Sequence, residues 1–200
     1  MRRSLPMSSR TGFIALEEDL SSIMSEARFL HSKATAESSL SLVCQFKEQL
    51  DPELCYKTAL LHDIAREWSD FELQAYAEKF SLLLEEEERE DPVLLHAPVG
   101  AHLLGEKGYE SSLCLAVRYH TLGSIAMGRL GLVLFIADYI EERRTHLNET
   151  TRKDLRSLPS LEMVCLEILG MQELHLHKKG KLPARCSVEL KHFLLADGRL

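Results

Sequence analysis

Two adjacent residues with metal-binding side chains, His62 and Asp63, interrupt an otherwise apolar run over residues 60–65. Adjacent residues on a helix point about 100° apart, so one face cannot bury both of them as ordinary core residues. Imidazole and carboxylate together suit iron, manganese or zinc and leave coordination positions for water. For an isolated pair, the simpler interpretation is a helix C-terminus with His62 capping carbonyl groups and Asp63 in solvent. The pair therefore indicates a metal site only if further ligands exist.

Four further candidate ligands lie in or beside apolar helical patterns, namely His31, His96, His120 and Asp138. Asp138 stands near the end of the most apolar segment of the chain, residues 130–140. A carboxylate in such a segment is costly to bury unless it is paired or bound to a cation. A metal centre assembled from several helices is therefore the interpretation that we test below.

The segments that would position these side chains show helical periodicity, with no convincing strand alternation and no internal repeat, so we expect an all-α fold. Apolar residues recur at helical spacing over residues 16–30, and a second helix is expected over residues 31–46. Asp51 and Pro52 suit the N-cap and the first position of the helix that ends with the His-Asp pair.

The second half of the chain continues the helical pattern. A helix that contains His96 is expected after residues 91–92 and should end near Gly108, which suits a C-cap. The acidic run before it, residues 85–90, is expected to form a solvated surface turn. Helical patterns extend to residue 174, and no clear pattern follows in residues 175–200.

The composition is typical of a globular protein in a reducing compartment. Of the 200 residues, 45% are hydrophobic, which suffices for one sizeable core. We expect no membrane span and no secretory signal, because no apolar stretch is long enough. The five cysteines form no CxxC pair, which favours a reduced, cytoplasmic protein. A net charge of -7 argues against nucleic acid as a partner, since that binding depends on many Lys and Arg contacts to phosphate.

The order His31, His62-Asp63, Asp138 resembles the ligand set of the HD phosphohydrolase superfamily. Two longer strings narrow the resemblance, LLHAPVGA at residues 94–101 and VRYHTLG at residues 117–123. Together with RFLH at residues 28–31 and ADYIE at residues 137–141, they resemble the bacterial HD-domain hydrolases that cleave diadenosine tetraphosphate symmetrically into two ADP.

The resemblance implies an HD-domain helical bundle over residues 16–174, with a flexible N-terminus over residues 1–15 and a C-terminal tail over residues 175–200. It also implies two divalent cations, usually described as iron, for which manganese, zinc or nickel could substitute. Carried over by motif, one cation would be held by His31, His62, Asp63 and Asp138, and the other by His96 and His120 with Asp63 bridging. Hydroxide activated by the cations would attack phosphorus, so no protein nucleophile is required.

Catalytic roles are expected for Asp63 and Arg66, and Arg66 is also the favoured contact to substrate phosphate. Arg66 stands where the family usually has lysine, which keeps the charge but replaces a point charge by a planar fork. The other candidate substrate contacts are Lys33, Arg118, Thr121 and Arg144. For Lys33 and Arg118, a plain surface role is at least as good an interpretation.

Other departures from the family pattern fall outside the six ligands. Glu142 replaces a common proline, Leu132 replaces a lysine, and residues 145–148 replace a Phe-Pro-Gly-Val segment. The preferred dinucleotide therefore stays open. Two alternative functions also stay open: another HD nucleotidase acting on mononucleotides or guanosine polyphosphates, and a non-catalytic module that binds nucleotide. Exposed apolar residues expected at Leu194 and Leu195 leave a homodimer possible.

Overall fold

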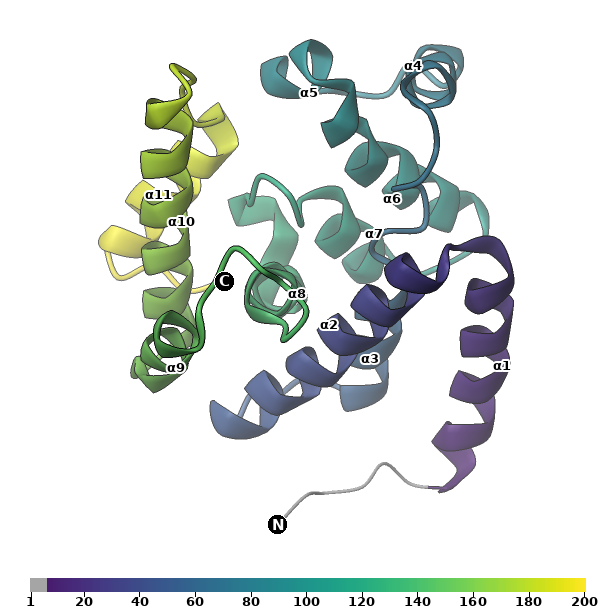
Figure 1. Cartoon of the computed structure of the whole chain (residues 1–200), viewed down its shortest axis with the longest axis horizontal. Helices are drawn as coiled ribbons and strands as arrows, with labels where there is room; N and C mark the ends of the chain where they lie inside the picture. The colour runs from purple at the N-terminus through teal and green to yellow at the C-terminus, as the bar shows by residue number, and fades with distance from the viewer. Residues whose placement is uncertain (1–6) are drawn as a thin grey trace.

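The computed structural model describes residues 7–200, with side chains from residue 13 onward, and the described residues form helices but no strands. The expected all-α fold is therefore confirmed (Figure 1). Residues 1–6 of the expected flexible N-terminus lie outside the described residues, and the first helix begins at Met7. The helices in chain order are α1 (Met7–Ile23), α2 (Glu26–Gln45), α3 (Pro52–Leu61), α4 (Asp70–Lys79), α5 (Glu86–Glu90), η1 (Pro92–Leu95), α6 (His96–Glu106), α7 (Ser111–Arg118), η2 (Ile125–Met127), α8 (Gly128–Ile140), α9 (Glu149–Ser157), α10 (Leu161–Lys178) and α11 (Arg185–Leu195).

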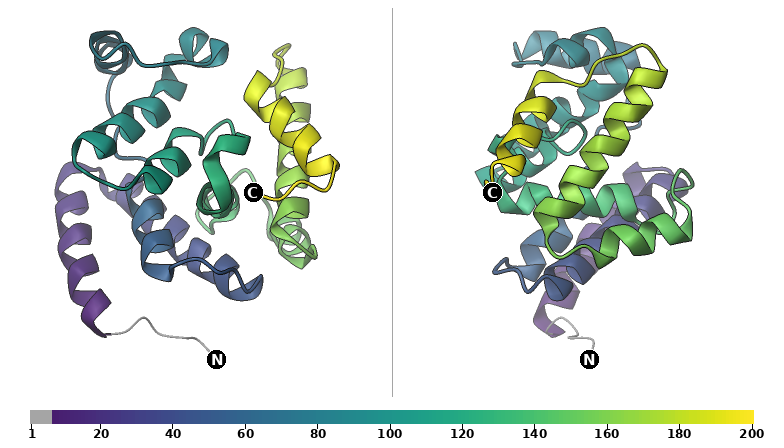
Figure 2. Two further views of the ribbon diagram at one scale, coloured as in Figure 1. Left: turned by 180° about the vertical axis from the view of Figure 1, so that it is seen from behind. Right: turned by 90° about the vertical axis from the view of Figure 1, so that its left-hand side faces the viewer.

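Helix α8 lies at the centre of the bundle, as the front and rear views show (Figures 1 and 2). Helices α2, α3, α7 and α10 pack around it. Residues 132–137 are buried on every side of α8, as expected for a helix that is apolar all round. Asp138 follows directly, so its carboxylate is held at the interior of the bundle. Within the described part of the chain, no helix has the length and apolar character needed to cross a bilayer.

The boundary between the first two helices differs from the expectation, because α2 begins at Glu26 rather than near residue 31. Ser25 is the N-cap of α2, and its hydroxyl accepts a hydrogen bond from the backbone N–H of Arg28 at 3.2 Å. The Glu67 carboxylate accepts a hydrogen bond from the backbone N–H of Ser25 at 2.8 Å. Met24 is buried and continues the apolar spacing across the break, which explains why periodicity did not locate it. As a result, Arg28 and His31 lie on the same helix.

The acidic run lies at the surface as expected, with residues 86, 89 and 90 exposed, but it forms a helix rather than a turn, and one of its acids is buried. Residues 86–90 form α5, and Glu88 within it is fully buried. The Glu88 carboxylate accepts hydrogen bonds from the Arg118 guanidinium at 2.5 and 2.8 Å. The sequence pattern did not identify Glu88 as buried, because a buried glutamate that pairs with an arginine has the same residue type as its exposed neighbours.

The C-terminal residues also contain a helix that the sequence pattern did not indicate. Helix α10 continues to Lys178, and α11 packs against α10 and η2. Leu194 is buried against this core, contrary to expectation, whereas Leu195 is exposed. Gly123 has a φ of 74°, and a Cβ there would lie 3.0 Å from Leu190 of α11. The close packing of α11 therefore depends on glycine at this position.

Candidate metal centre

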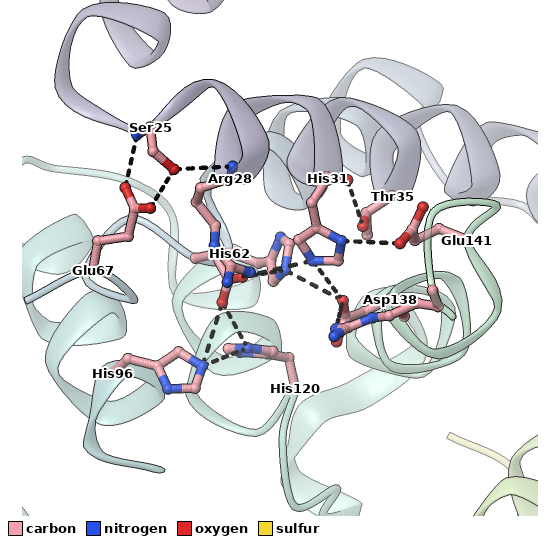
Figure 3. A network of polar contacts seen from close by, with 12 residues as sticks. Ser25, Arg28, His31, Thr35, His62, Glu67, His96, His120, Asp138 and Glu141 are labelled. Atoms are coloured by element: carbon pink, nitrogen blue, oxygen red, sulfur yellow. Dashed lines mark hydrogen bonds and ion pairs between the residues drawn. The ribbon is translucent and has the colours of Figure 1, made fainter. Parts of the chain in front are cut away.

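The six candidate ligands lie together inside the bundle. Figure 3 labels five of them, and the sixth, Asp63, lies within 3.6 Å of all four histidines. The six ligands come from five parts of the helical framework: the first half of α2, the two residues that follow α3, the first residue of α6, the second residue after α7 and the last turn of α8. None of their side chains is more than 15% exposed, and Asp138 is the most exposed of them. The residues are His31, His62, Asp63, His96, His120 and Asp138.

Asp63 connects two groups of potential ligand atoms. Its Oδ2 lies 3.4 Å from Nε2 of His62 and 3.6 Å from Nε2 of His31. Its Oδ1 lies 3.3 Å from Nε2 of His96 and 3.5 Å from Nε2 of His120. Ligand atoms about 2.1 Å from a shared cation lie about 3 to 4 Å from one another. Each oxygen of Asp63 is therefore spaced to share a cation with two imidazoles.

Asp138 extends the first of these groups. Its Oδ1 lies 3.0 Å from Nε2 of His31 and 3.5 Å from Nε2 of His62. His31 and His62 thus face two carboxylates, Asp63 and Asp138, whereas the second group has Asp63 alone. Two carboxylates and two imidazoles are a donor set that iron, manganese and zinc all accept.

The imidazole rings are oriented so that Nε2 points to the centre. Nδ1 of His62, His96 and His120 each lies close to the carbonyl oxygen three residues earlier, at 2.6, 2.5 and 2.7 Å. Nδ1 of His31 lies 3.1 Å from the buried Glu141 carboxylate. Because these oxygens only accept, Nδ1 carries a proton, which leaves Nε2 as the nitrogen that can bind a metal. Nε2 of His31 and of His62 is buried with no hydrogen-bond partner. A bound cation would satisfy both atoms, so the residues present fit a metal.

Two arginines contact the carboxylates of the cluster. The Arg28 guanidinium donates a hydrogen bond to Asp63, and the Arg144 guanidinium donates one to Asp138. Burial alone would raise the pKa of Asp138, but Arg144 and the neighbouring imidazoles hold it well below its usual range. Burial would likewise raise the pKa of Asp63, but the neighbouring imidazoles lower it. His62 contributes most, because the two carboxylates raise its own pKa to about 10 despite its burial, and a cation bound at Nε2 of His62 would take the place of that proton. Both acids are therefore ionised, as metal ligands must be.

The candidate substrate contacts differ in their position relative to this cluster. Arg144 lies against it, and Arg66 is half-buried in the turn that follows α3. Thr121 follows His120, and its hydroxyl oxygen is buried with no hydrogen-bond partner. Lys33 instead forms an ion pair with Glu17 of α1 at 2.7 Å.

Arg118 is likewise engaged away from the cluster, by Glu88 and by the carbonyl oxygen of Leu83 at 3.1 Å.

Sequence reasoning did not assign roles to Arg28 or Glu141, although both belong to the strings that carried the resemblance. The sequence did contain a signal for each of these two residues, namely its distance from a candidate ligand. Arg28 lies three residues before His31, and Glu141 lies three residues after Asp138, a separation that places side chains on the same side of a helix.

Comparisons with known proteins agree with this geometry. The HD domain family model matches residues 28–143, a range that contains all six clustered residues. A symmetrical bis(5'-nucleosyl)-tetraphosphatase of Bacillus subtilis (strain 168) is 33% identical over 126 residues, which cover 60% of this chain and 64% of that protein. A second protein of the same description, from Halalkalibacterium halodurans, is 32% identical over 129 residues with the same coverage. The chain thus matches 64% of the length of these curated relatives.

The fold also matches a crystal structure from Clostridium acetobutylicum, described as a predicted HD superfamily hydrolase involved in NAD metabolism. The TM-score is 0.81 and the identity 22%, with 92% of this chain and 97% of that chain covered. At this identity, the likeness establishes the common fold. Since the family model spans more than half of the sequence and the paired His62 and Asp63 lie at the centre of the structure, the chain belongs to the HD domain family.

Proposed function

We propose that this chain is a metal-dependent hydrolase that cleaves diadenosine tetraphosphate symmetrically into two ADP. The observation that carries the proposal is the position of Asp63, whose two oxygens face separate groups of imidazole nitrogens. The relatives described as symmetrical bis(5'-nucleosyl)-tetraphosphatases support the choice of substrate. Two cations, iron in the first instance, with manganese, zinc or nickel as substitutes, would occupy the two groups.

Divalent cations bound there would lower the pKa of a water molecule towards neutrality and stabilise negative charge on phosphoryl oxygens. The chain's own residues hold the two ligand groups together and limit the access of water. Asp63 holds the two groups together, and Asp138 adds the second carboxylate of the first group. Buried imidazoles surround the centre and limit the access of bulk water. In the balanced reaction, water attacks one of the two central phosphorus atoms, and the bond from that atom to the central bridging oxygen breaks.

Phosphate binding is assigned to arginines at the edge of the cluster. The Arg28 and Arg144 side chains contact the carboxylates of the cluster and are 23% and 34% exposed, so neither is fully buried. A guanidinium can donate two parallel hydrogen bonds to a phosphate, which holds the anion in one orientation. We add Arg28 to Arg66 and Arg144 as proposed phosphate contacts. Their charge would offset that of the departing ADP.

Product analysis tests the proposal. Metal-loaded protein is incubated with diadenosine tetraphosphate in ¹⁸O-labelled water. The nucleotides are separated by chromatography, and their masses are measured by mass spectrometry. We expect ADP as the sole product, with one labelled oxygen in half of the ADP molecules. Asp63→Asn should reduce turnover at least a thousandfold, whereas Asp154→Asn, at an exposed position on α9, should not change it.

Other outcomes would contradict the proposal in distinguishable ways. ATP plus AMP would show asymmetric cleavage. Turnover of guanosine polyphosphates or mononucleotides, without cleavage of the dinucleotide, would identify a different HD nucleotidase. Full activity of Asp63→Asn would remove the metal centre from the mechanism.

A further inference from the structure

A cleft of about 930 Å³ opens beside the metal centre. One wall comes from α5 and η1, and the facing wall comes from the pair α10 and α11. The residues that follow His120 and Asp138 in the sequence also line the cleft. The volume is within the range of about 300 to 1,000 Å³ found for small-molecule sites. The cleft is therefore large enough for a substantial part of a nucleotide.

The inner end of the cleft adjoins the cluster. Thr121 and Tyr139 line the cleft, and each directly follows a clustered residue, His120 or Asp138. His146 also lines it, two residues after the arginine that contacts Asp138. Asp138, the most exposed member of the cluster at 15%, precedes Tyr139 and contacts Arg144, so the cleft lies nearest the Asp138 side of the cluster. A ligand that lies in the cleft against Tyr139 is therefore close to the Asp138 end of the cluster.

The lining of the cleft suits a nucleobase. The rings of Tyr139 and His146 meet edge to face, with centroids 4.8 Å apart. Leu94, Leu122 and Leu174 add apolar surface around them. Bases bind proteins through such aromatic and apolar contacts, and a few polar atoms fix their orientation. Here the imidazole nitrogens and the phenol hydroxyl can supply those polar contacts.

Charges along the cleft favour one orientation of a bound nucleotide. Four carboxylates, from residues 86, 87, 90 and 91, line the α5 and η1 side of the cleft. They outnumber the two ammonium groups opposite, and one of those, Lys181, already lies 3.5 Å from Asp91. Phosphates are therefore disfavoured along the α5 and η1 side and favoured towards Arg144, which contacts Asp138 and lies two residues before His146. An uncharged base and ribose fit the rim, where carboxylates can accept hydrogen bonds from ribose hydroxyls.

The C-terminal wall is held in place by specific contacts. The Ser187 hydroxyl donates a hydrogen bond to the carbonyl oxygen of Leu122 at 2.6 Å, which ties the first turn of α11 to the segment after His120. The Lys191 ammonium pairs with Glu173, which ties α11 to α10. The cleft is therefore a feature of the folded core with both C-terminal helices as one wall.

From the position, lining and charge of this cleft, we propose that it binds one nucleoside of the nucleotide substrate, with the base against Tyr139 and His146 and the phosphates directed to the metal centre. The proposal deepens the proposed function and rests on it for the nature of the substrate. It makes His146 and the C-terminal helices determinants of which nucleotides bind.

Steady-state kinetics of metal-loaded variants test this proposal. His146→Ala removes one of the two aromatic contacts, and Leu174→Ser removes an apolar contact from the α10 wall. Each variant is measured with diadenosine tetraphosphate and with bis(p-nitrophenyl) phosphate, which has no nucleoside. Loss of one aromatic contact to a base is expected to raise KM for the dinucleotide about tenfold, with kcat within about twofold. KM and kcat for bis(p-nitrophenyl) phosphate should not change.

The matched control is His177→Ala, an exposed histidine on α10 that does not line the cleft. It should behave as wild type with both substrates. Leu174 is 57% exposed, so its substitution should leave folding intact even if His146→Ala does not fold. Unchanged KM for the dinucleotide in Leu174→Ser and in folded His146→Ala would overturn the proposal.

Calorimetric titration with ADP separates this proposal from the proposed function, because it needs no turnover. If the wild type binds ADP and both variants bind it about tenfold more weakly, the cleft assignment is supported even if diadenosine tetraphosphate is not cleaved. If the variants bind ADP as the wild type does, the assignment fails whatever the activity. Absence of ADP binding by metal-loaded wild type would also overturn it.

Discussion

The two oxygens of Asp63 predict an unequal effect of removing single ligands on metal content. Asp63 belongs to both groups of ligand atoms, whereas His96 belongs only to the second. We expect two cations per chain in the wild type, about one in His96→Ala, and close to none in Asp63→Asn. The reason is that His96→Ala leaves the first group complete, with His31, His62 and both carboxylates.

The same reasoning gives a magnitude for thermal stability. A cation present at one hundred times its dissociation constant stabilises the folded state by about 2.7 kcal/mol. For a chain of this size, 1 kcal/mol shifts Tm by about 2 to 4 °C. Each bound cation should therefore raise Tm by about 5 to 11 °C. Wild type should show about twice the metal-dependent shift of His96→Ala, and Asp63→Asn should show almost none.

Two assays measure these quantities. Elemental analysis after dialysis counts cations per chain, and thermal denaturation is recorded with added metal and with chelator for each variant. The difference between the two denaturation curves of one variant cancels any effect of the substitution itself on the apo protein. His177→Ala is the control and should match the wild type. Equal metal loss in His96→Ala and Asp63→Asn, or a wild-type Tm insensitive to chelator, would refute the shared-carboxylate arrangement.

Three further predictions concern the residues around the centre. Glu141→Gln, which weakens the hydrogen bond that orients His31, should lower metal affinity about tenfold or more in a chelator competition assay. Glu88→Ala leaves the Arg118 guanidinium without its buried partner and should cost about 3 kcal/mol of unfolding free energy in urea; a cost under about 1 kcal/mol would contradict this account. Gly123→Ala introduces a Cβ at positive φ against α11 and should cost about 1 to 3 kcal/mol. Gly170→Ala, in open space on α10, should be neutral or stabilising in the same measurement.

Several features of the fold were predictable because they depend on local sequence. Asp51 is the N-cap of α3 and Pro52 its first residue, as the sequence predicts. The apolar segment over residues 130–140 forms the buried helix α8. Such features arise from backbone hydrogen bonds and side-chain periodicity within a few residues. Sequence patterns report both directly.

Other features escaped prediction because they depend on a distant partner. Glu88 is buried only because Arg118, thirty residues away, supplies the counter-charge. Residues 185–195 form α11, and their apolar side chains are buried by α10 and by the segment around Gly123. Neither partner is apparent from the local sequence. A surface turn and a tail without structure were the expectations that local patterns supported.

The division between sequence and tertiary structure is clearest at the centre itself. The sequence alone determined the side-chain types and, through the HD resemblance, the six residues that could bind metal. Helical periodicity sets which way a side chain points on its own helix, but not how far apart the faces of different helices lie. The packing of α2, α3, α6, α7 and α8 sets those distances, and it places Asp63 between two groups of imidazoles. Packing also brings Arg28 and Arg144 to the cluster while Lys33 and Arg118 pair elsewhere, because each charged side chain pairs with the acid that the fold places within its reach.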